Sequence, residues 1–274
     1  MRYRFIAFDL DGTLLKSLTE VSEENYAALK TLYEMGVIMV PTTGRSLYEM
    51  PKEVRECPYF RYAITSGGAC TYDLRTEEMI ASSLLSKEEA EKLFNLLDEY
   101  DNVTMTHYRG YSYVDKTQSI EYYDKCRVTN AFKTFIPIFD DAVDDFGAYC
   151  RKMDGIELTC SFFSTDKDKE EFKARIKEAG SYTVVASAKD NLEVLSGSVD
   201  KGVAVLSLAG SLGIKREETV GVGDSINDLA MIKAVGLGIA MGNALDALKV
   251  EADAVGCNCK DHIARFILEN YFNT

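Results

Sequence analysis

The chain has 274 residues, of which 46% are apolar and 27% charged, and this length allows one large domain or two modest ones. No apolar run approaches the roughly 18 residues of a membrane span, and a formal net charge of −13 argues against nucleic-acid binding, which requires basic patches. The seven cysteines are scattered and lack zinc-ligand spacing, which predicts structural thiols in a reducing compartment. The N-terminal apolar stretch is too short for a signal peptide, so we expect a cytoplasmic protein.

The first part of the chain predicts a β-α-β unit. Residues 5–8 (Phe-Ile-Ala-Phe) form a short apolar run, which is typical of a strand buried on both faces. Ser22 is a suitable N-cap for a helix that ends at Gly36, and residues 37–40 resume the strand pattern before Pro41. A strand, helix and strand in this order predict a parallel sheet.

The middle of the chain has a different pattern from about Ser82 onward. We expect a helix from Ser86 through Tyr100 and strand-like stretches at 103–108 and 111–114. Further expected elements are acidic helical stretches near 140–153 and 167–179 and strands at 156–163 and 182–186. This block predicts an inserted α+β domain.

From Asn191 the first pattern returns, with expected helices at 201–213 and 228–235 and strands at 220–223 and 238–241. We therefore predict an α/β fold with a doubly wound parallel, Rossmann-like core sheet and an inserted α+β domain. The expected boundaries are 1–81 and 188–274 for the core and 82–187 for the insert.

The motif Asp9-Leu-Asp11-Gly-Thr follows the first expected strand directly. In open parallel sheets, ligands bind beyond the carboxyl ends of the strands. One of the two carboxylates can act as a nucleophile and the other as an acid and then a base, and both can supply oxygen ligands to Mg²⁺. The simpler alternative is a polar turn, in which Asp and Gly serve turn geometry.

Two further motifs offer groups that hold phosphate. Thr43, Gly44 and Arg45 follow the second expected strand, where a hydroxyl and backbone N–H groups can hold phosphate oxygens. Lys201 opens an expected helix and supplies a point charge for a phosphoryl group. Taken singly, Arg45 and Lys201 are better explained as solvated surface residues.

The last motif, residues 221–228 (Gly-Val-Gly-Asp-Ser-Ile-Asn-Asp), follows another expected strand. Asp224 and Asp228 share a helix face if a helix has begun, and such close like charges are stable only with a cation between them. The alternative is a simple N-cap and a first-turn charge. All four motifs lie at expected strand ends or helix starts, which predicts one converging site.

Together these motifs resemble those of the haloacid dehalogenase superfamily. Residues 238–244 (Gly-Ile-Ala-Met-Gly-Asn-Ala), followed by Ala-Asp-Ala-Val at 252–255, are similar to its Cof-type branch, which has a type IIB cap. The resemblance covers the core and is much weaker over the insert. It departs from the branch at Ser66-Gly-Gly-Ala69, where Asn-Gly-Ala is usual, and at Cys259-Lys-Asp-His262, where an acidic residue and Gly are usual.

The resemblance implies a phosphatase in which Asp9 forms an aspartyl-phosphate and Asp11 is the acid and base. Thr43 and Lys201 would hold the phosphoryl group, with Gly44, Arg45 and Asn227 as further candidate substrate-binding residues. Mg²⁺ would be bound at Asp9, Asp11 (through its backbone carbonyl), Asp224 and Asp228. The insert would close over the site as a cap.

We therefore expect a Mg²⁺-dependent phosphomonoesterase of small phosphorylated metabolites, sugar phosphates being the favoured class. The presence of Asp11 argues against dehalogenation. A phosphomutase and a non-catalytic metabolite sensor remain as alternatives, and the sequence indicates neither the oligomeric state nor the cap residues that set specificity.

Overall fold

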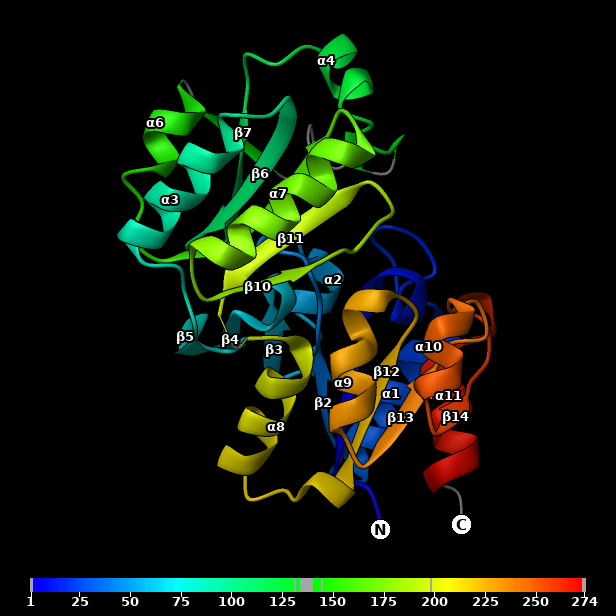
Figure 1. Cartoon of the computed structure of the whole chain (residues 1–274). Helices are drawn as coiled ribbons and strands as arrows, with labels where there is room; N and C mark the ends of the chain where they lie inside the picture. Colours follow the sequence, from blue (N-terminus) through cyan, green and yellow to red (C-terminus); the bar gives the residue numbers. More distant parts are fainter. Residues whose placement is uncertain (1, 131, 134–139, 144, 198, 273–274) are drawn as a thin grey trace. The chain divides into compact units, whose positions relative to one another are not determined.

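The computed structural model describes residues 2–130, 132–133, 140–143, 145–197 and 199–272. The chain divides into two units, each with its own sheets (Figure 1). The first unit consists of Met1–Arg45, Met50–Ser82 and Asp200–Thr274, and the second of Ser46–Glu49 and Ser83–Val199.

The main sheet of the first unit is wholly parallel, with strand order β14-β13-β12-β1-β2. Its strands are β1 (Phe5–Phe8), β2 (Ile38–Pro41), β12 (Thr219–Gly223), β13 (Leu237–Ala240) and β14 (Ala254–Val255). Strand β1 lies between β12 and β2, because Phe5 pairs with Thr219 on one side and with Ile38 on the other. The carboxyl ends of β1, β2 and β12 therefore meet at one edge of the sheet.

Helices accompany this sheet. They are α1 (Glu23–Glu34), α2 (Lys52–Arg55), α8 (Lys201–Ser211), α9 (Leu229–Ala234), α10 (Asp246–Glu251) and α11 (Ile263–Ile267). Three of them (α1, α8 and α9) were expected from the sequence, and α2, α10 and α11 were not. Phe5 and Ala7 pack in one apolar cluster with α8 and α9, whereas Ile6 and Phe8 point to the opposite face of the strand. Helix α1 packs against α11. The predicted doubly wound α/β core is thereby confirmed.

The local signals at α1 are also confirmed. The hydroxyl of Ser22 accepts a hydrogen bond from the backbone N–H of Asn25 at 3.2 Å, as an N-cap residue should. Gly36 follows the helix with a φ of 83°, a conformation that glycine adopts without strain.

A small antiparallel sheet in the first unit was not predicted. Its strands are β3 (Tyr62–Thr65), β4 (Cys70–Asp73) and β5 (Glu78–Ser82), in that order. The short helical turn Ser66–Gly68 joins β3 to β4, and Gly68 has a φ of 107°. A Cβ atom at Gly68 would lie 2.5 Å from the carbonyl oxygen of Asp200, so this turn packs directly on the backbone that begins α8.

The second unit contains a six-stranded sheet with order β10-β11-β9-β6-β7-β8. Neighbouring strands are antiparallel except β7 and β8, which are parallel. The strands are β6 (Asn102–Tyr108), β7 (Tyr111–Asp115), β8 (Asp140–Val143), β9 (Ile156–Phe163), β10 (Tyr182–Val185) and β11 (Asn191–Ser196). The helices are α3 (Lys87–Leu97), α4 (Ile120–Lys125), α6 (Phe146–Cys150) and α7 (Asp166–Ala179). This α+β composition agrees with the predicted insert.

The segment Ser46–Glu49 belongs to the second unit, although the residues on both sides of it belong to the first. The backbone N–H of Tyr48 donates to the carbonyl of Gly110 at 2.9 Å, and the Tyr48 ring stacks on Tyr111 with centroids 4.2 Å apart. Glu49 lies 3.2 Å from His107, and both side chains are buried. These contacts fix four residues of an otherwise first-unit loop to the second unit's sheet.

Two sequence predictions were wrong in the second unit. Residues 191–196 were assigned to the core and no strand was expected there, but they form β11, which pairs with β9 and β10, so the second unit extends to Val199 instead of ending at 187. The stretch near 140–153 was expected to be helical, but it contains β8 and the short helix α6, with residue 144 outside the described residues. Strand β11 pairs with β9 and strand β8 pairs with β7, and these partners lie well before them in the sequence, where the local pattern does not reveal them.

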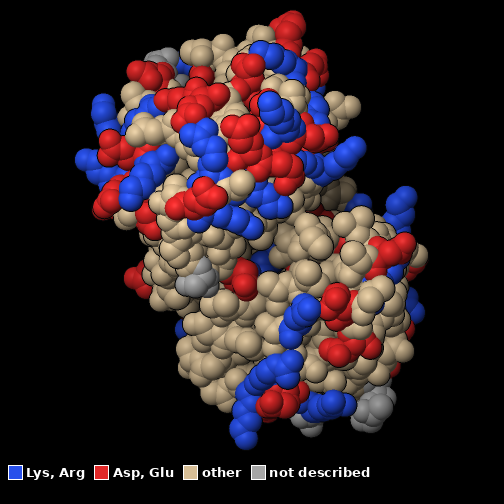
Figure 2. Space-filling model, viewed as in Figure 1, with Lys and Arg blue, Asp and Glu red and all other residues tan. Residues whose placement is uncertain are grey.

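No helix in the described part of the chain has both the length and the apolar character needed to cross a bilayer. On the face of the second unit seen in Figure 2, Lys and Arg side chains are interspersed with Asp and Glu. That face therefore presents no uninterrupted basic area of the kind that binds nucleic acid.

Two glycines of helix α8 provide a matched test of this packing. We expect Gly202→Ala to destabilise the protein by about 1–3 kcal/mol, because its Cβ would lie 2.5 Å from the carbonyl oxygen of Ala230. Gly210→Ala has open space at its Cβ and should stabilise by about 0.4–1 kcal/mol. Urea unfolding of the two full-length variants measures both effects, and equal midpoints would contradict the close packing of α8 on α9.

Candidate active site

The residue that follows β1 is Asp9, and its backbone N–H continues the sheet by donating to the Val222 carbonyl at 2.9 Å. The chain then makes a tight turn in which Gly12 has a φ of 75°. A Cβ at this glycine would lie only 2.2 Å from a carboxylate oxygen of Asp224. Both the backbone conformation and the approach of Asp224 therefore require glycine in the first motif.

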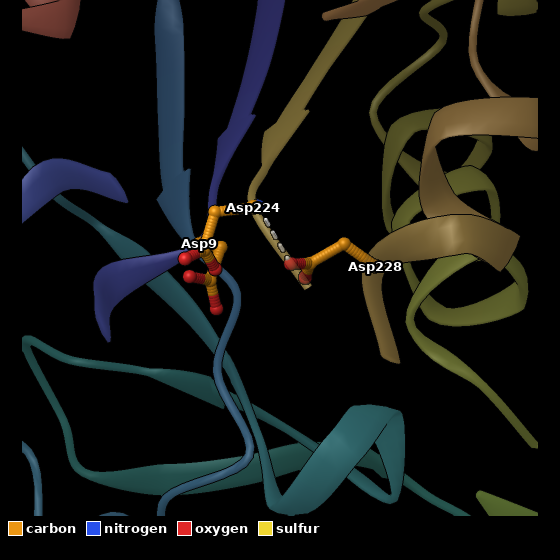
Figure 3. A group of neighbouring side chains, drawn as sticks. All are labelled: Asp9, Asp224 and Asp228. Carbon is orange, nitrogen blue, oxygen red and sulfur yellow. Dashed lines mark hydrogen bonds between the residues drawn. The ribbon is translucent and has the colours of Figure 1, made fainter. Parts of the chain in front are cut away.

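Three carboxylates come together at the carboxyl ends of β1 and β12. Asp9, Asp224 and Asp228 each offer an oxygen that lies within 4.8 Å of the others (Figure 3). Asp9 and Asp228 are buried, and Asp224 is partly buried. Because like charges so close together repel one another, the cluster favours positive charge among its oxygens.

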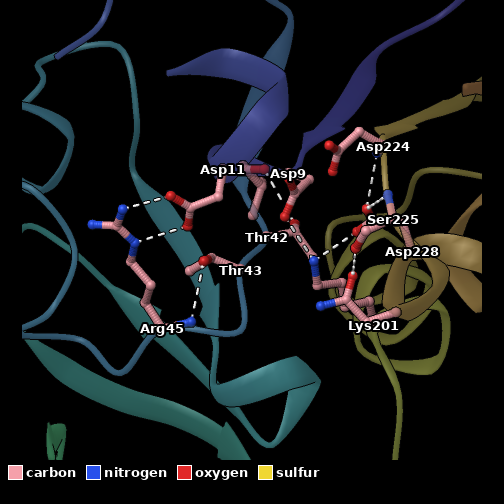
Figure 4. Close-up of polar contacts among 11 residues, drawn as sticks. Asp9, Asp11, Thr42, Thr43, Arg45, Lys201, Asp224, Ser225 and Asp228 are labelled. Atoms are coloured by element: carbon pink, nitrogen blue, oxygen red, sulfur yellow. Dashed lines mark hydrogen bonds and ion pairs between the residues drawn. The ribbon is translucent and has the colours of Figure 1, made fainter. Parts of the chain in front are cut away.

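Lys201 supplies one such charge from the first residue of α8. Its Nζ donates to Asp9 Oδ1 at 2.8 Å and to Asp228 Oδ1 at 2.6 Å, and the side chain is 1% exposed (Figure 4). Burial alone would lower the pKa of Lys201, but the carboxylates of Asp228 and Asp9 raise this pKa above its ordinary value. Lys201 is therefore a buried ammonium, and the solvated-lysine alternative is wrong.

One lysine does not balance the cluster. Burial, together with the charge of Asp228, raises the pKa of Asp9 well above its usual value, and Lys201 opposes this effect only in part. Burial and Asp228 likewise raise the pKa of Asp224 to about 7. The site thus has excess negative charge that a divalent cation would neutralise.

Asp228 organises the loop that carries Asp224. Its Oδ2 accepts hydrogen bonds from the backbone N–H groups of Asp224 at 3.0 Å and Ser225 at 3.1 Å. Its other oxygen accepts from Lys201. Asn227 is engaged locally, since its Oδ1 accepts from the Ser225 hydroxyl at 2.6 Å. Asp228 is the last residue of a short helical turn and the N-cap of α9. The helix that was expected to begin at 228 therefore begins at Leu229.

The donor set fits magnesium, which prefers carboxylate and carbonyl oxygens. With both Asp228 oxygens already accepting hydrogen bonds, the carboxylates of Asp9 and Asp224 are the better placed ligands. The predicted metal residues Asp9, Asp224 and Asp228 are thus brought together by the fold. Asp11, the fourth predicted ligand, was expected to act through its backbone carbonyl, and its side chain pairs with Arg45 instead of joining the cluster.

Asp11 forms a bidentate ion pair with Arg45. Arg45 Nε donates to Asp11 Oδ2 at 2.8 Å, and its terminal nitrogen donates to Oδ1 at 2.6 Å (Figure 4). The same nitrogen donates to the Leu18 carbonyl at 2.8 Å. Arg45 is 8% exposed, so it is not the surface residue that its sequence position alone would indicate.

The loop after β2 places Thr43 and Gly44 beside this pair. The hydroxyl of Thr43 accepts from the backbone N–H of Arg45 at 3.2 Å, and its own N–H donates to the Ile64 carbonyl at 2.9 Å. The turn at Ser66 also contacts this loop, because the backbone N–H of Ser66 donates to the Arg45 carbonyl at 2.8 Å. The previously unpredicted strand β3 therefore holds the candidate phosphate-binding loop.

Sequence reasoning missed one residue of the site, Asn243. Its side-chain amide contacts Gly12 and Asp224, which belong to the first and last motifs. The available signal was its position, since Gly-Asn follows β13 at the same edge of the sheet as the other motifs.

Comparison with known proteins agrees with this geometry. A family model described as haloacid dehalogenase-like hydrolase matches residues 6–267. Phosphatase YwpJ of Bacillus subtilis is 31% identical, over 94% of this chain and 96% of the relative. The 5-amino-6-(5-phospho-D-ribitylamino)uracil phosphatase YcsE of the same organism is 26% identical, over 96% and 94%.

A solved haloacid dehalogenase-like hydrolase from B. subtilis has the same fold. It superimposes with a TM-score of 0.83 at 26% identity and covers 98% of this chain and 100% of its own. The family match, the relatives and the fold agree with the resemblance carried by the four motifs. The chain belongs to the haloacid dehalogenase-like hydrolase family and is a phosphomonoesterase of its Cof-type branch.

Proposed function

We propose that this enzyme hydrolyses small phosphorylated metabolites with Mg²⁺, through an aspartyl-phosphate at Asp9. The observation that carries the proposal is the position of Asp9. It is buried at the carboxyl end of β1, with Lys201 on one oxygen and Asp224 beside it. A nucleophile needs this kind of orientation by a neighbouring charge.

Asp9 and Asp224, with the backbone carbonyl of Asp11, would hold the metal ion, and Asp228 would support them. When bound, Mg²⁺ neutralises phosphate charge and favours attack by an anionic nucleophile. Asp228 acts in this scheme by fixing both Lys201 and the loop of Asp224.

In the first step, an oxygen of the Asp9 carboxylate attacks phosphorus in line with the ester oxygen. The bond between phosphorus and that ester oxygen breaks, and Asp11 gives the leaving oxygen a proton. Thr43, Gly44, Lys201 and Asn227 would hold the phosphoryl oxygens while negative charge develops on them.

In the second step, water attacks phosphorus while Asp11 takes its proton. The bond from phosphorus to Asp9 then breaks, which releases inorganic phosphate and restores the Asp9 carboxylate and the protonated Asp11 with which the cycle began. The ion pair with Arg45 suits the ionised Asp11 that this step requires. We therefore propose that the main role of Arg45 is to hold Asp11, and that contact with the substrate is its secondary role.

Sugar phosphates and related polyol phosphates are the favoured substrate class. The relative YcsE is named for a phosphoribityl substrate, in which the phosphate is an ester of a sugar alcohol. The branch resemblance supports the same class.

Because seven cysteines form no disulfide within the described residues, we also place the enzyme in the reducing cytoplasm.

A panel of sugar phosphates, polyol phosphates, nucleotides and pyridoxal phosphate tests the reaction class. We expect release of inorganic phosphate and the dephosphorylated alcohol in equal amounts, fastest with a sugar or polyol phosphate. Product analysis by phosphorus NMR separates this from the alternative phosphomutase. An isomerised ester without free phosphate would establish the mutase, and slow turnover of all sugar and polyol esters would overturn the substrate class.

Two variants separate the proposed roles of the carboxylates. Asp9→Asn should lower turnover by at least about 10³-fold, because it removes the nucleophile. Asp11→Asn should still release one equivalent of nitrophenol from 4-nitrophenyl phosphate, since that leaving group needs no proton, and then stall as the phosphoenzyme. Rapid-quench kinetics measures the burst, and circular dichroism checks the fold. A burst from Asp9→Asn would exclude the covalent mechanism.

Metal removal should abolish turnover and lower stability. We expect a chelator to stop phosphate release and added Mg²⁺ to restore it. Mg²⁺ at about 100 times its Kd should add about 2.7 kcal/mol to the free energy of unfolding, because it binds only the folded carboxylate cluster. Thermal unfolding with and without Mg²⁺ measures this, with Asp224→Asn as the variant that should lose most of the gain. Turnover that survives chelation would disprove the metal requirement.

A further inference from the structure

Asn243 joins three separate segments of the first unit through its side-chain amide. Its Nδ2 donates to the Gly12 carbonyl at 2.9 Å and to Asp224 Oδ2 at 3.3 Å. Its Oδ1 accepts from the backbone N–H of Cys259 at 2.8 Å. The Gly12 carbonyl can only accept and the Cys259 backbone N–H can only donate, so these two partners fix the orientation of the amide.

These contacts determine where the Asp224 carboxylate lies. Its Oδ2 is the atom that packs against Gly12, at the position where a Cβ could not fit. Among the described residues, the one side-chain hydrogen bond to this carboxylate comes from Asn243. Without that donor, the repulsion of Asp9 and Asp228 would turn the Asp224 carboxylate outward, since it is the least buried of the three.

We propose that Asn243 is a positioning residue of the metal site, which holds the Asp224 carboxylate against the Gly12 backbone so that the cation meets a formed set of ligands. The proposal rests on the function proposed above, in which Asp224 binds Mg²⁺. A hydrogen bond from outside the ligand set commonly orients a metal-binding carboxylate, and its loss costs affinity for the metal.

The loop at Cys259 holds the other end of the Asn243 amide. The short helical turn Cys259–Asp261 begins at the residue whose N–H holds Asn243 Oδ1. The backbone of this loop therefore orients the Asn243 amide, and the amide in turn orients the Asp224 carboxylate. The chain departs from the branch pattern in this loop, yet the contact it makes with Asn243 uses only backbone and does not depend on the side chain of Cys259.

Isothermal titration of the full-length protein with Mg²⁺ alone tests the proposal without a substrate. We expect Asn243→Ala to raise the Kd for Mg²⁺ about tenfold. Asn258→Ala is the matched control, because Asn258 lies in the same loop but donates to Asp261 instead of the metal site. Its Kd should stay within about twofold of the parent. At saturating Mg²⁺, the KM for substrate should be nearly equal in all three proteins.

A second pair of variants tests the hydrogen bond from the Cys259 backbone N–H to Asn243 by itself. This pair still tests the proposal if Asn243→Ala folds poorly. Cys259→Pro removes the N–H that holds Asn243, at the first residue of a helical turn, where proline fits after the extended Asn258. It should weaken Mg²⁺ binding, whereas Cys259→Ala, which keeps the N–H, should not.

The outcomes are distinct. If the parent protein itself binds no Mg²⁺, the proposed metal site fails and this proposal with it. If the parent binds Mg²⁺ but Asn243→Ala and Cys259→Pro bind it within about twofold as tightly, the proposed function stands and the role of Asn243 is overturned. Equal weakening by Asn258→Ala would also overturn it, because the effect would then belong to the loop in general.

Discussion

The placing of several buried negative charges around one buried ammonium is the constraint on which the first unit depends. Asp9 and Asp224 follow the ends of two strands, Asp228 lies in the short helical turn before α9, and Lys201 comes from the start of a helix distant in sequence. Such a group is stable only if every oxygen has a donor or a cation. The backbone donors to Asp228 and the lysine shared by two carboxylates meet part of that requirement, and the remaining oxygens of Asp9 and Asp224 are those that a cation could neutralise.

The sequence was sufficient to predict this convergence but not the contacts within it. Buried apolar runs such as residues 5–8 identify parallel strands, and the carboxyl ends of parallel strands share one edge. Asp9, Thr43, Lys201 and Asp224 could therefore be brought together from motif order alone. The pairing of Asp11 with Arg45 could not, because it depends on the path of two loops whose residues have no period.

The errors in the fold have a similar origin. The first four residues of β11, Asn-Leu-Glu-Val at 191–194, alternate polar with apolar side chains, which suits a strand in an antiparallel sheet, and one of its two partners, β9, lies well before it in the sequence. Strand β3 is short and buried throughout, and nothing in its composition shows that it supports the loop of Thr43. Local sequence predicts that a segment is extended more readily than it predicts which strand it will join.

The four residues Ser46–Glu49 have a consequence for protein engineering. The covalent chain passes from one unit to the other at 45/46 and 49/50 as well as at 82/83 and 199/200. A chimera built by grafting another enzyme's 83–199 segment onto this scaffold would leave Tyr48 without Tyr111 and Glu49 without His107. A transplant that keeps its native anchorage must therefore carry a second, much smaller cassette immediately after Arg45. The exchangeable module in this protein is discontinuous, and its shorter piece directly follows the candidate phosphate-binding loop in the sequence.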